Sequence, residues 1–184
     1  MIETQRLILR RPTLADAPAM QDIKQANWPE LQKWMVWAAD DQLSMDATKS
    51  FITDFVENDF KNGGCILFAF HKETNDLVMV GGFNATDTQH VYSTGYWGNI
   101  DYLSQGYATE MTRAIIDYAF TQHAAEKILI SYFEGNEKSK RIIEKCGFDF
   151  LEKKEKYHKS FATSEMMDEY CYVLTKNNWK QQKP

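Results

Sequence analysis

The sequence has few cysteines and prolines and no long apolar run. Its 184 residues include three cysteines and four prolines, and Cys65, Cys146 and Cys171 form no closely spaced pair. An odd number of cysteines at this spacing excludes a disulfide scaffold and a zinc-finger motif, and it predicts reduced, mostly buried thiols. No stretch approaches 18 apolar residues, so we expect no membrane span and no membrane partner.

Several motifs of export and catalysis are also missing. The first twenty residues carry charges throughout and have no continuous apolar core, so they do not resemble a signal peptide. The histidines show neither an H-E-x-x-H motif nor paired spacing, so no metal site is expected. Neither a G-x-S-x-G elbow nor a G-K-[ST] phosphate loop occurs. We expect a soluble, cytoplasmic protein.

The composition is that of an ordinary globular domain. Hydrophobic residues make up 43% and charged residues 26% of the chain, and a chain of this length buries enough surface for a stable core. No linker or repeat interrupts it, so we expect a single domain over residues 1–184. Aromatic residues make up 14%; they either fill the core or line a ligand cleft.

The charge balance bears on the partners. The net charge is −5 and the isoelectric point is near 5.4. This balance argues against sequence-independent binding to nucleic acid, and it suits a cationic substrate. We expect no nucleic-acid partner, and the protein to be a monomer or a homodimer.

Apolar periodicity predicts the element order β-α-α-α-β-β-β-α-β-α-β-β, which is a mixed central sheet flanked by helices in the α/β or α+β class. Pro29 is expected in the first turn of the second helix. Gly81 and Gly82 indicate a bulge or a close backbone approach. The expected strands cover residues 5–11, 65–71, 77–84, 90–97, 127–133, 148–157 and 167–175, and the expected helices cover 13–26, 29–38, 44–63, 106–122 and 136–146.

The segment 103–109, LSQGYAT, lies between a strand and a strong helix. A turn with a glycine and a small residue lets several backbone N–H groups point at one place, where the helix N-terminus adds partial positive charge. This arrangement suits a phosphate or pyrophosphate, although a glycine near a helix start is also common without any ligand. On the helix surface, Glu110, Arg113 and Asp117 are expected to pair with one another.

The second notable segment is 134–139, EGNEKS, followed by a helix that closes at Gly147. Asn136 is a good N-cap, and Ser139 falls in the first turn. Each residue taken singly is explained by capping or by a local hydrogen bond to the backbone.

The order of these segments resembles the GNAT superfamily of acyl-CoA-dependent N-acetyltransferases. The resemblance rests on GYW-(5)-LSQGYATEMTRAIIDYAF, a strand and N-E-K-S-(6)-CGF, and it extends to ETQRLILRRPTLADAPAM, WPELQKWMVWA and DEYCYVLTKNNW. These segments look like the branch that acetylates the N-terminal amines of ribosomal proteins. The resemblance covers essentially the whole chain and implies a GNAT fold.

The resemblance implies acetyl-CoA as co-substrate, bound against the strand that ends at Tyr96 and Trp97. It implies that backbone amides of the 105–109 turn hold the pyrophosphate, that Asn136 touches the pantetheine arm, and that Ser139 protonates the departing thiolate. The implied cofactor-binding residues are Trp97, Gly98, Asn99, Gln105, Gly106, Tyr107, Ala108, Thr109, Asn136 and Ser139.

Two positions depart from the family pattern. Leu103 stands where the family usually has Arg or Gln, and Ile100 stands where this branch often has a glutamate that serves as general base. Isoleucine cannot accept a proton. Asp101 is the nearest carboxylate in sequence and is the second expected catalytic residue beside Ser139, although in an extended segment it would face the other way. Asp40 and Asp41 are further acidic alternatives.

A site without a strong base favours an acceptor amine of low pKa. An α-amine has a pKa near 8, so keeping it neutral at pH 7 costs roughly 1.4 kcal/mol, whereas a lysine amine near 10.4 costs roughly 4.6 kcal/mol. The resemblance implies that the segment around 28–37 forms one wall of the acceptor pocket. Its expected substrate-binding residues are Trp28, Glu30, Trp34 and Trp37, although the tryptophans could simply pack on the sheet.

The expected activity is therefore transfer of an acetyl group to a primary amine by direct attack on the thioester. The favoured acceptor is the α-amine of a ribosomal or other protein. Two alternatives remain open: a small amine such as a polyamine or an antibiotic, and a non-catalytic acyl-CoA-binding protein, which the residues Leu103 and Ile100 suggest.

Overall fold

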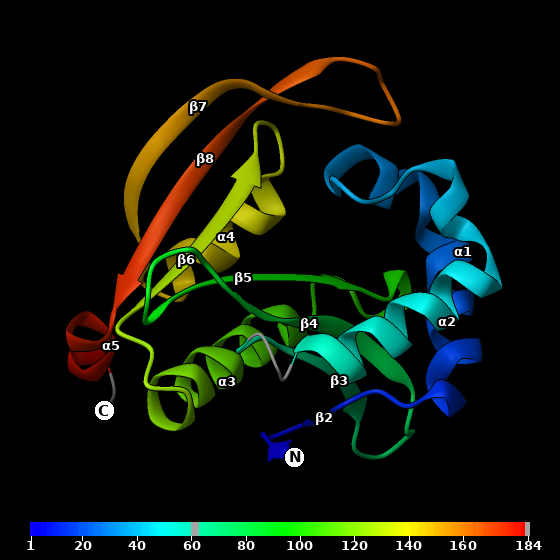
Figure 1. The fold of residues 1–184 in the computed structure, drawn as a ribbon, viewed down its shortest axis with the longest axis horizontal. Coiled ribbons are helices and arrows are strands. Elements are labelled where there is room, and N and C mark those ends of the chain that lie inside the picture. Colours follow the sequence, from blue (N-terminus) through cyan, green and yellow to red (C-terminus); the bar gives the residue numbers. More distant parts are fainter. Residues whose placement is uncertain (60–62, 183–184) are drawn as a thin grey trace.

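The computed structural model describes residues 1–59 and 63–182. One eight-stranded sheet has the order β1-β2-β3-β4-β5-β6-β8-β7 (Figure 1). All neighbouring strands are antiparallel except β5 and β6, which are parallel. The strands are β1 (Ile2–Glu3), β2 (Leu7–Arg10), β3 (Cys65–His71), β4 (Leu77–Ala85), β5 (Val91–Gly98), β6 (Lys127–Phe133), β7 (Asp149–Lys159) and β8 (Met166–Thr175).

Helices cover both faces of the sheet. On β3, Leu67 and Ala69 belong to the core under α3 and α4, whereas Phe68 and Phe70 belong to the core under α1 and α2. This alternation is the period of two that a strand buried on both faces requires. The expected mixed α/β architecture is confirmed. The helices are α1 (Ala17–Trp34), α2 (Met45–Asp54), α3 (Tyr107–Gln122), α4 (Glu137–Lys145) and α5 (Lys176–Gln182).

The N-terminal helices differ from the prediction. The expected break before Pro29 is wrong, because α1 continues through Pro29 as one helix. Proline in a helix interior removes one hydrogen bond and costs about 3 kcal/mol. Trp28 and Leu31, on either side of it, are buried, and their packing holds the helix on the sheet. The third helix was expected to end at Gly63 and Gly64. Residues 60–62, just before that point, lie outside the described residues.

Other details of the fold follow or extend the prediction. The meander of β3, β4 and β5 is confirmed. Strand β1 and helix α5 were not predicted, because two residues and seven residues are too few for a periodic signal.

All three cysteines are buried, and none forms a disulfide in the described residues. Among those residues, no helix combines the length and apolarity needed to cross a membrane.

At Gly82 the backbones of β3 and β4 approach closely. This is one of the two alternatives expected from the glycine pair, a bulge or a close approach. A Cβ at this position would lie 2.0 Å from the carbonyl oxygen of Cys65 on the neighbouring strand. Gly95 on β5 offers the opposite case, since nothing lies within 4 Å of a Cβ built there. Of these two positions, Gly82 requires glycine for steric reasons and Gly95 does not.

We expect Gly82→Ala to lower the free energy of unfolding by about 3 kcal/mol, because backbone atoms of β3 must move to admit the methyl group. Gly95→Ala is the matched control and should change the free energy of unfolding little. Urea denaturation of both variants measures the difference. Equal stability of the two variants would contradict the role given to Gly82.

A buried lysine connects α1 to the segment before α2. The side chain of Lys24 is buried; its Nζ donates to Thr48 Oγ1 at 2.9 Å and to the carbonyl oxygen of Gln42. The rings of Trp28 and Trp37 lie about 6 Å away, at 5.8 and 6.0 Å. Because burial penalises the ammonium form, the pKa of Lys24 falls to about 8.

The lowered pKa of Lys24 predicts that stability rises with pH. Between pH 8 and the value of about 10.4 for a lysine in an unfolded chain, the unfolded state binds more protons than the folded state. The free energy of unfolding should rise there by up to about 1.4 kcal/mol per pH unit. Urea denaturation from pH 7 to pH 10 tests this, with Lys24→Met as the variant that lacks the titrating group. Identical pH slopes for the two proteins would refute the prediction.

Candidate active site

The two parallel strands at the centre of the sheet separate along their length. Pairing of β5 with β6 is limited to Val91 with Lys127, Tyr92 with Ile128 and Ser93 with Leu129. Beyond these pairs β6 rises away from β5 (Figure 1), so residues 94–98 pair only with β4. Backbone groups on the free side of this stretch have no partner strand, and a bound molecule with amide groups can pair with them.

Helix α3 begins beside this separation without a side-chain cap. Its N-cap is Gly106, with φ of +88°, and no side chain in the described structure caps it. The first N–H groups of a helix have no partner within the helix, so those at Tyr107, Ala108 and Thr109 remain available to an anion. By contrast, Ser44 caps α2 with its hydroxyl. The turn at 105–109 thus presents unpaired N–H groups to which an anion can bind.

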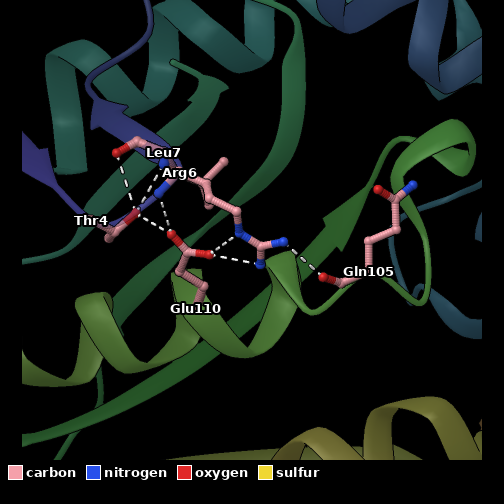
Figure 2. Close-up of polar contacts among 5 residues, drawn as sticks. All are labelled: Thr4, Arg6, Leu7, Gln105 and Glu110. Atoms are coloured by element: carbon pink, nitrogen blue, oxygen red, sulfur yellow. Dashed lines mark hydrogen bonds and ion pairs between the residues drawn. The ribbon is translucent and has the colours of Figure 1, made fainter. Parts of the chain in front are cut away.

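The segment between β1 and β2 supports this turn. Arg6 forms an ion pair with Glu110 at 2.8 Å and donates from Nη1 to the carbonyl oxygen of Gln105 at 3.0 Å (Figure 2). The expected pairing of Glu110 with Arg113 is not what the described structure contains: Glu110 pairs with Arg6, and Arg113 donates to the carbonyl oxygen of Lys145. Sequence reasoning missed this contact because it joins residues 104 positions apart.

A cavity of about 960 Å³ begins at this turn and runs along the outer side of α3. Gly106, Thr109 and Glu110 line it together with the first five residues of the chain. Neither Tyr96 nor Ser139 lines it, so this cavity adjoins the pyrophosphate turn and not the hydroxyl pair described next.

Helix α4 begins at the end of β6 and presents two expected residues. Asn136 caps the helix, because its Oδ1 accepts the backbone N–H of Ser139 at 3.1 Å. The Ser139 hydroxyl lies 3.1 Å from the hydroxyl of Tyr96 on β5, so this hydrogen bond spans the two separated strands. Burial raises the pKa of Tyr96 well above its usual value, so its phenol stays protonated.

Tyr96 was not among the expected site residues. The strand alternation was a usable signal, because Tyr96 and Trp97 must point to opposite faces of β5. Trp97 points into the core under α1, with its ring 5.7 Å from that of Trp37, which is in turn 6.2 Å from that of Trp28. The structure thus brings these three tryptophans together as core packing.

Gly98 and Asn99 also turn toward α1 and the following segment. The carbonyl oxygen of Gly98 accepts the side-chain N–H of Asn27 at 3.1 Å, and Asn99 caps the short 3-10 helix Ile100–Tyr102. A contact of Trp97, Gly98 or Asn99 with acetyl-CoA would therefore come from their backbone groups.

Glu30 and Trp34 lie apart from the tryptophan core. Trp34 Nε1 donates to Glu30 Oε1 at 3.2 Å, and the Trp34 ring lies 3.6 Å from a Cβ built on Gly135 in the turn before α4. The loop between β7 and β8 covers this end of α1, since Ala162 N–H donates to the carbonyl oxygen of Gln32 at 3.2 Å. These contacts place Glu30 and Trp34 beside the turn that carries Asn136.

Asp101 is placed elsewhere. It lines a cavity of about 470 Å³ together with Asp22, Asp76 and the N-terminal half of α1, and neither Tyr96 nor Ser139 lines that cavity. Ile100 is 45% exposed. The structure therefore does not bring Asp101 together with Ser139.

His158 on β7 is a further residue that sequence reasoning passed over. Its Nε2 is buried with no hydrogen-bond partner in the described residues, and its ring stacks on Phe133 at 5.2 Å. Burial lowers the pKa of His158, despite an opposing effect of Glu169, so the imidazole is held neutral. No group of potential metal ligands occurs in the described part of the chain.

Comparison with known proteins agrees with this geometry. Residues 6–149 match the family described as "Acetyltransferase (GNAT) domain". The uncharacterized N-acetyltransferase p20 of Bacillus licheniformis is 27% identical, with 96% of each chain covered; alignments to the curated relatives cover between 41% and 96% of their lengths. The chain therefore belongs to the GNAT acetyltransferase family.

Solved structures show the same fold. RimL, a ribosomal L7/L12 α-N-protein acetyltransferase in complex with coenzyme A, has a TM-score of 0.85 at 17% identity, covering 94% of this chain and 95% of that chain. The microcin C7 self-immunity acetyltransferase MccE, in complex with acetyl-CoA and AMP, has a TM-score of 0.82 at 21% identity, covering 94% and 93%. This protein is an N-acetyltransferase, and acetyl-CoA is its co-substrate.

We expect Ser139→Ala to lower kcat about tenfold or more at saturating acceptor, because the variant lacks the hydroxyl that the family resemblance implies as proton donor to the thiolate. Ser139→Thr keeps a hydroxyl and should retain more activity, and Tyr96→Phe should cause a smaller loss than Ser139→Ala. Release of free thiol from acetyl-CoA measures all three variants. An unchanged kcat for Ser139→Ala would remove Ser139 from the reaction.

Proposed function

We propose that this protein transfers the acetyl group of acetyl-CoA to the α-amine of a ribosomal or other protein, in one catalytic domain over residues 1–184 and in the cytoplasm. The observation that carries the proposal is the separation of β5 from β6, with an uncapped helix N-terminus on one side and the Ser139–Tyr96 hydroxyl pair across it. RimL, which acts on a ribosomal α-amine by its name, has the same fold.

The residues present fit acetyl-CoA at both of its polar parts. The free N–H groups at the start of α3 suit the pyrophosphate, and Gly106 adds no Cβ that would block the approach. The unpaired stretch of β5 suits the amides of the pantetheine arm, and the side-chain N–H₂ of Asn136 remains free to donate because its Oδ1 caps α4. Acetyl-CoA supplies the activated acyl group.

In the proposed reaction the neutral amine attacks the thioester carbonyl carbon directly. The new C–N bond forms, the C–S bond breaks, and the amine loses its proton to water. The departing thiolate takes a proton from the Ser139 hydroxyl. Tyr96, 3.1 Å away, passes a proton to Ser139 and regains one from the water that accepted the amine proton. A thiol has a reference pKa of about 8.5, so a weak proton donor is sufficient.

No carboxylate hydrogen-bonds to Ser139 in the described part of the chain, which supports an α-amine acceptor. Ile100 offers no base, and Asp101 lies in a different cavity. The substrate must therefore supply its own neutral amine, and the cost of deprotonation at pH 7 is roughly 3 kcal/mol lower for an α-amine than for a lysine side chain. Glu30 and Trp34, beside the turn before α4, offer a carboxylate and an aromatic surface to such an acceptor.

A peptide panel tests the proposal. We expect thiol release from acetyl-CoA with peptides that have a free N-terminus, and none with the same peptides blocked at the N-terminus but containing lysine. The rate should rise with pH up to about 8, as the α-amine loses its proton. Turnover of polyamines or antibiotics alone would indicate a small-molecule enzyme, and calorimetric CoA binding with no turnover of any amine would indicate a non-catalytic binding protein.

A further inference from the structure

The guanidinium of Arg6 lies against three consecutive residues of the turn 103–109. Its Nη1 donates to the carbonyl oxygen of Gln105 at 3.0 Å, and its Cζ lies 4.0 Å from the centre of the Tyr107 ring. Its Nη2 lies 3.4 Å from a Cβ built on Gly106. The turn contains no lysine or arginine of its own, so Arg6 brings a positive charge from another part of the chain.

Glu110 holds this guanidinium in place (Figure 2). Glu110 Oε2 accepts from Arg6 Nε and Nη2, both at 2.8 Å. Its Oε1 accepts from the backbone N–H of Arg6 at 2.8 Å and from the hydroxyl of Thr4 at 2.6 Å. Burial alone would raise the pKa of Glu110, but the hydrogen bonds from Thr4 and Arg6 lower it below its usual value, so the carboxylate stays charged.

These contacts fix the direction of two peptide groups. In a trans peptide the C=O and the following N–H point in opposite directions. Because Arg6 binds the carbonyl oxygen of Gln105, the N–H of Gly106 is turned away from Arg6. The backbone N–H of Glu110 donates to the carbonyl oxygen of Gly106 at 3.0 Å. This hydrogen bond turns the C=O of Gly106 into the helix, so the N–H of Tyr107 points away from it.

We infer that Arg6 and Glu110 are positioning residues for the pyrophosphate of acetyl-CoA. Arg6 orients the Gly106 amide of the turn and adds a positive charge next to it, while Glu110 fixes the guanidinium. This inference rests on the proposed placement of the pyrophosphate at the start of α3. It explains why an exposed turn retains a defined conformation although no side chain caps its helix.

A second ion pair near the N-terminus serves as a matched control. Arg10 and Asp16 form an ion pair at 2.6 Å, with side chains 37% and 9% exposed, against 36% and 15% for Arg6 and Glu110. Thr13 donates to Asp16 as Thr4 donates to Glu110, and Arg10 lies 4.1 Å from the ring centre of Phe70. This pair has the same chemistry but, among the described residues, makes no hydrogen bond or ring contact with the turn.

The experiment compares Arg6→Lys and Glu110→Gln with Arg10→Lys and Asp16→Asn. For Arg6→Lys we expect the KM for acetyl-CoA and the Kd for CoA to rise about tenfold, with kcat within about twofold, because lysine cannot form the forked contact. Glu110→Gln should give a smaller rise. S-acetylpantetheine, which lacks the pyrophosphate, should be used equally well by wild type and all four variants.

Each outcome has a definite meaning. If the wild type does not bind CoA, the proposed function falls and this inference falls with it. If the wild type binds CoA and Arg6→Lys binds it equally well, only the inference is overturned. The inference is also overturned if Arg6→Lys raises the KM for acetyl-CoA and the KM for S-acetylpantetheine by the same factor. It is overturned as well if Arg10→Lys raises the KM for acetyl-CoA as much as Arg6→Lys does. Either result indicates a merely structural role. Should Arg6→Lys fail to fold, Glu110→Gln in the same assays decides.

Discussion

The parallel pairing of β5 and β6 stops after three residue pairs, and the rest of the candidate site depends on this separation. A continuous ladder would use the backbone groups at the end of β5 for the sheet itself. Because the strands diverge, these groups stay unpaired on one side, and the helices that follow β5 and β6 both begin next to the same region (Figure 1). One break in pairing thus supplies both a strand edge and two helix N-termini.

Contacts between distant segments hold each side of this region. On the α3 side, the segment between β1 and β2 contributes Arg6 to the uncapped turn. Across the separation, Ser139 and Tyr96 join α4 to β5. At the C-terminal end of α1, the loop between β7 and β8 covers the last residues of the helix. Ser160 and Ala162 donate hydrogen bonds to backbone carbonyl oxygens there. The sheet can thereby keep a central gap between two strands without losing its pairing on either side.

Much of the fold could be predicted because its signals are local. The apolar runs of β3 and β4, the serine before α2 and the asparagine before α4 each act within a few residues, and the structure agrees with them. The errors arose where packing outweighs a local preference. Pro29 indicates a helix start by its chemistry, but burial of Trp28 and Leu31 keeps α1 continuous. Helix α5 is too short to have a periodic pattern.

The candidate site divides in the same way. Gly106, Asn136 and Ser139 could be proposed from sequence because each sits at a helix start, where the backbone geometry determines what the residue does. Tyr96, Glu110 and His158 could not, because their partners are 43, 104 and 25 residues away in the chain. Four residues were expected to bind the acceptor substrate. Glu30 and Trp34 lie at the turn before α4, whereas Trp28 and Trp37 pack with the core.

The sequence by itself therefore determined the elements, their caps and the resemblance to the acetyltransferase family, since these depend on residue types at short spacing. Only the tertiary structure decided which face each aromatic ring occupies and which carboxylate meets which cation. The physical reason is that ion pairs, ring contacts and burial depend on distances in space, and these are set by the way the strands pair and diverge.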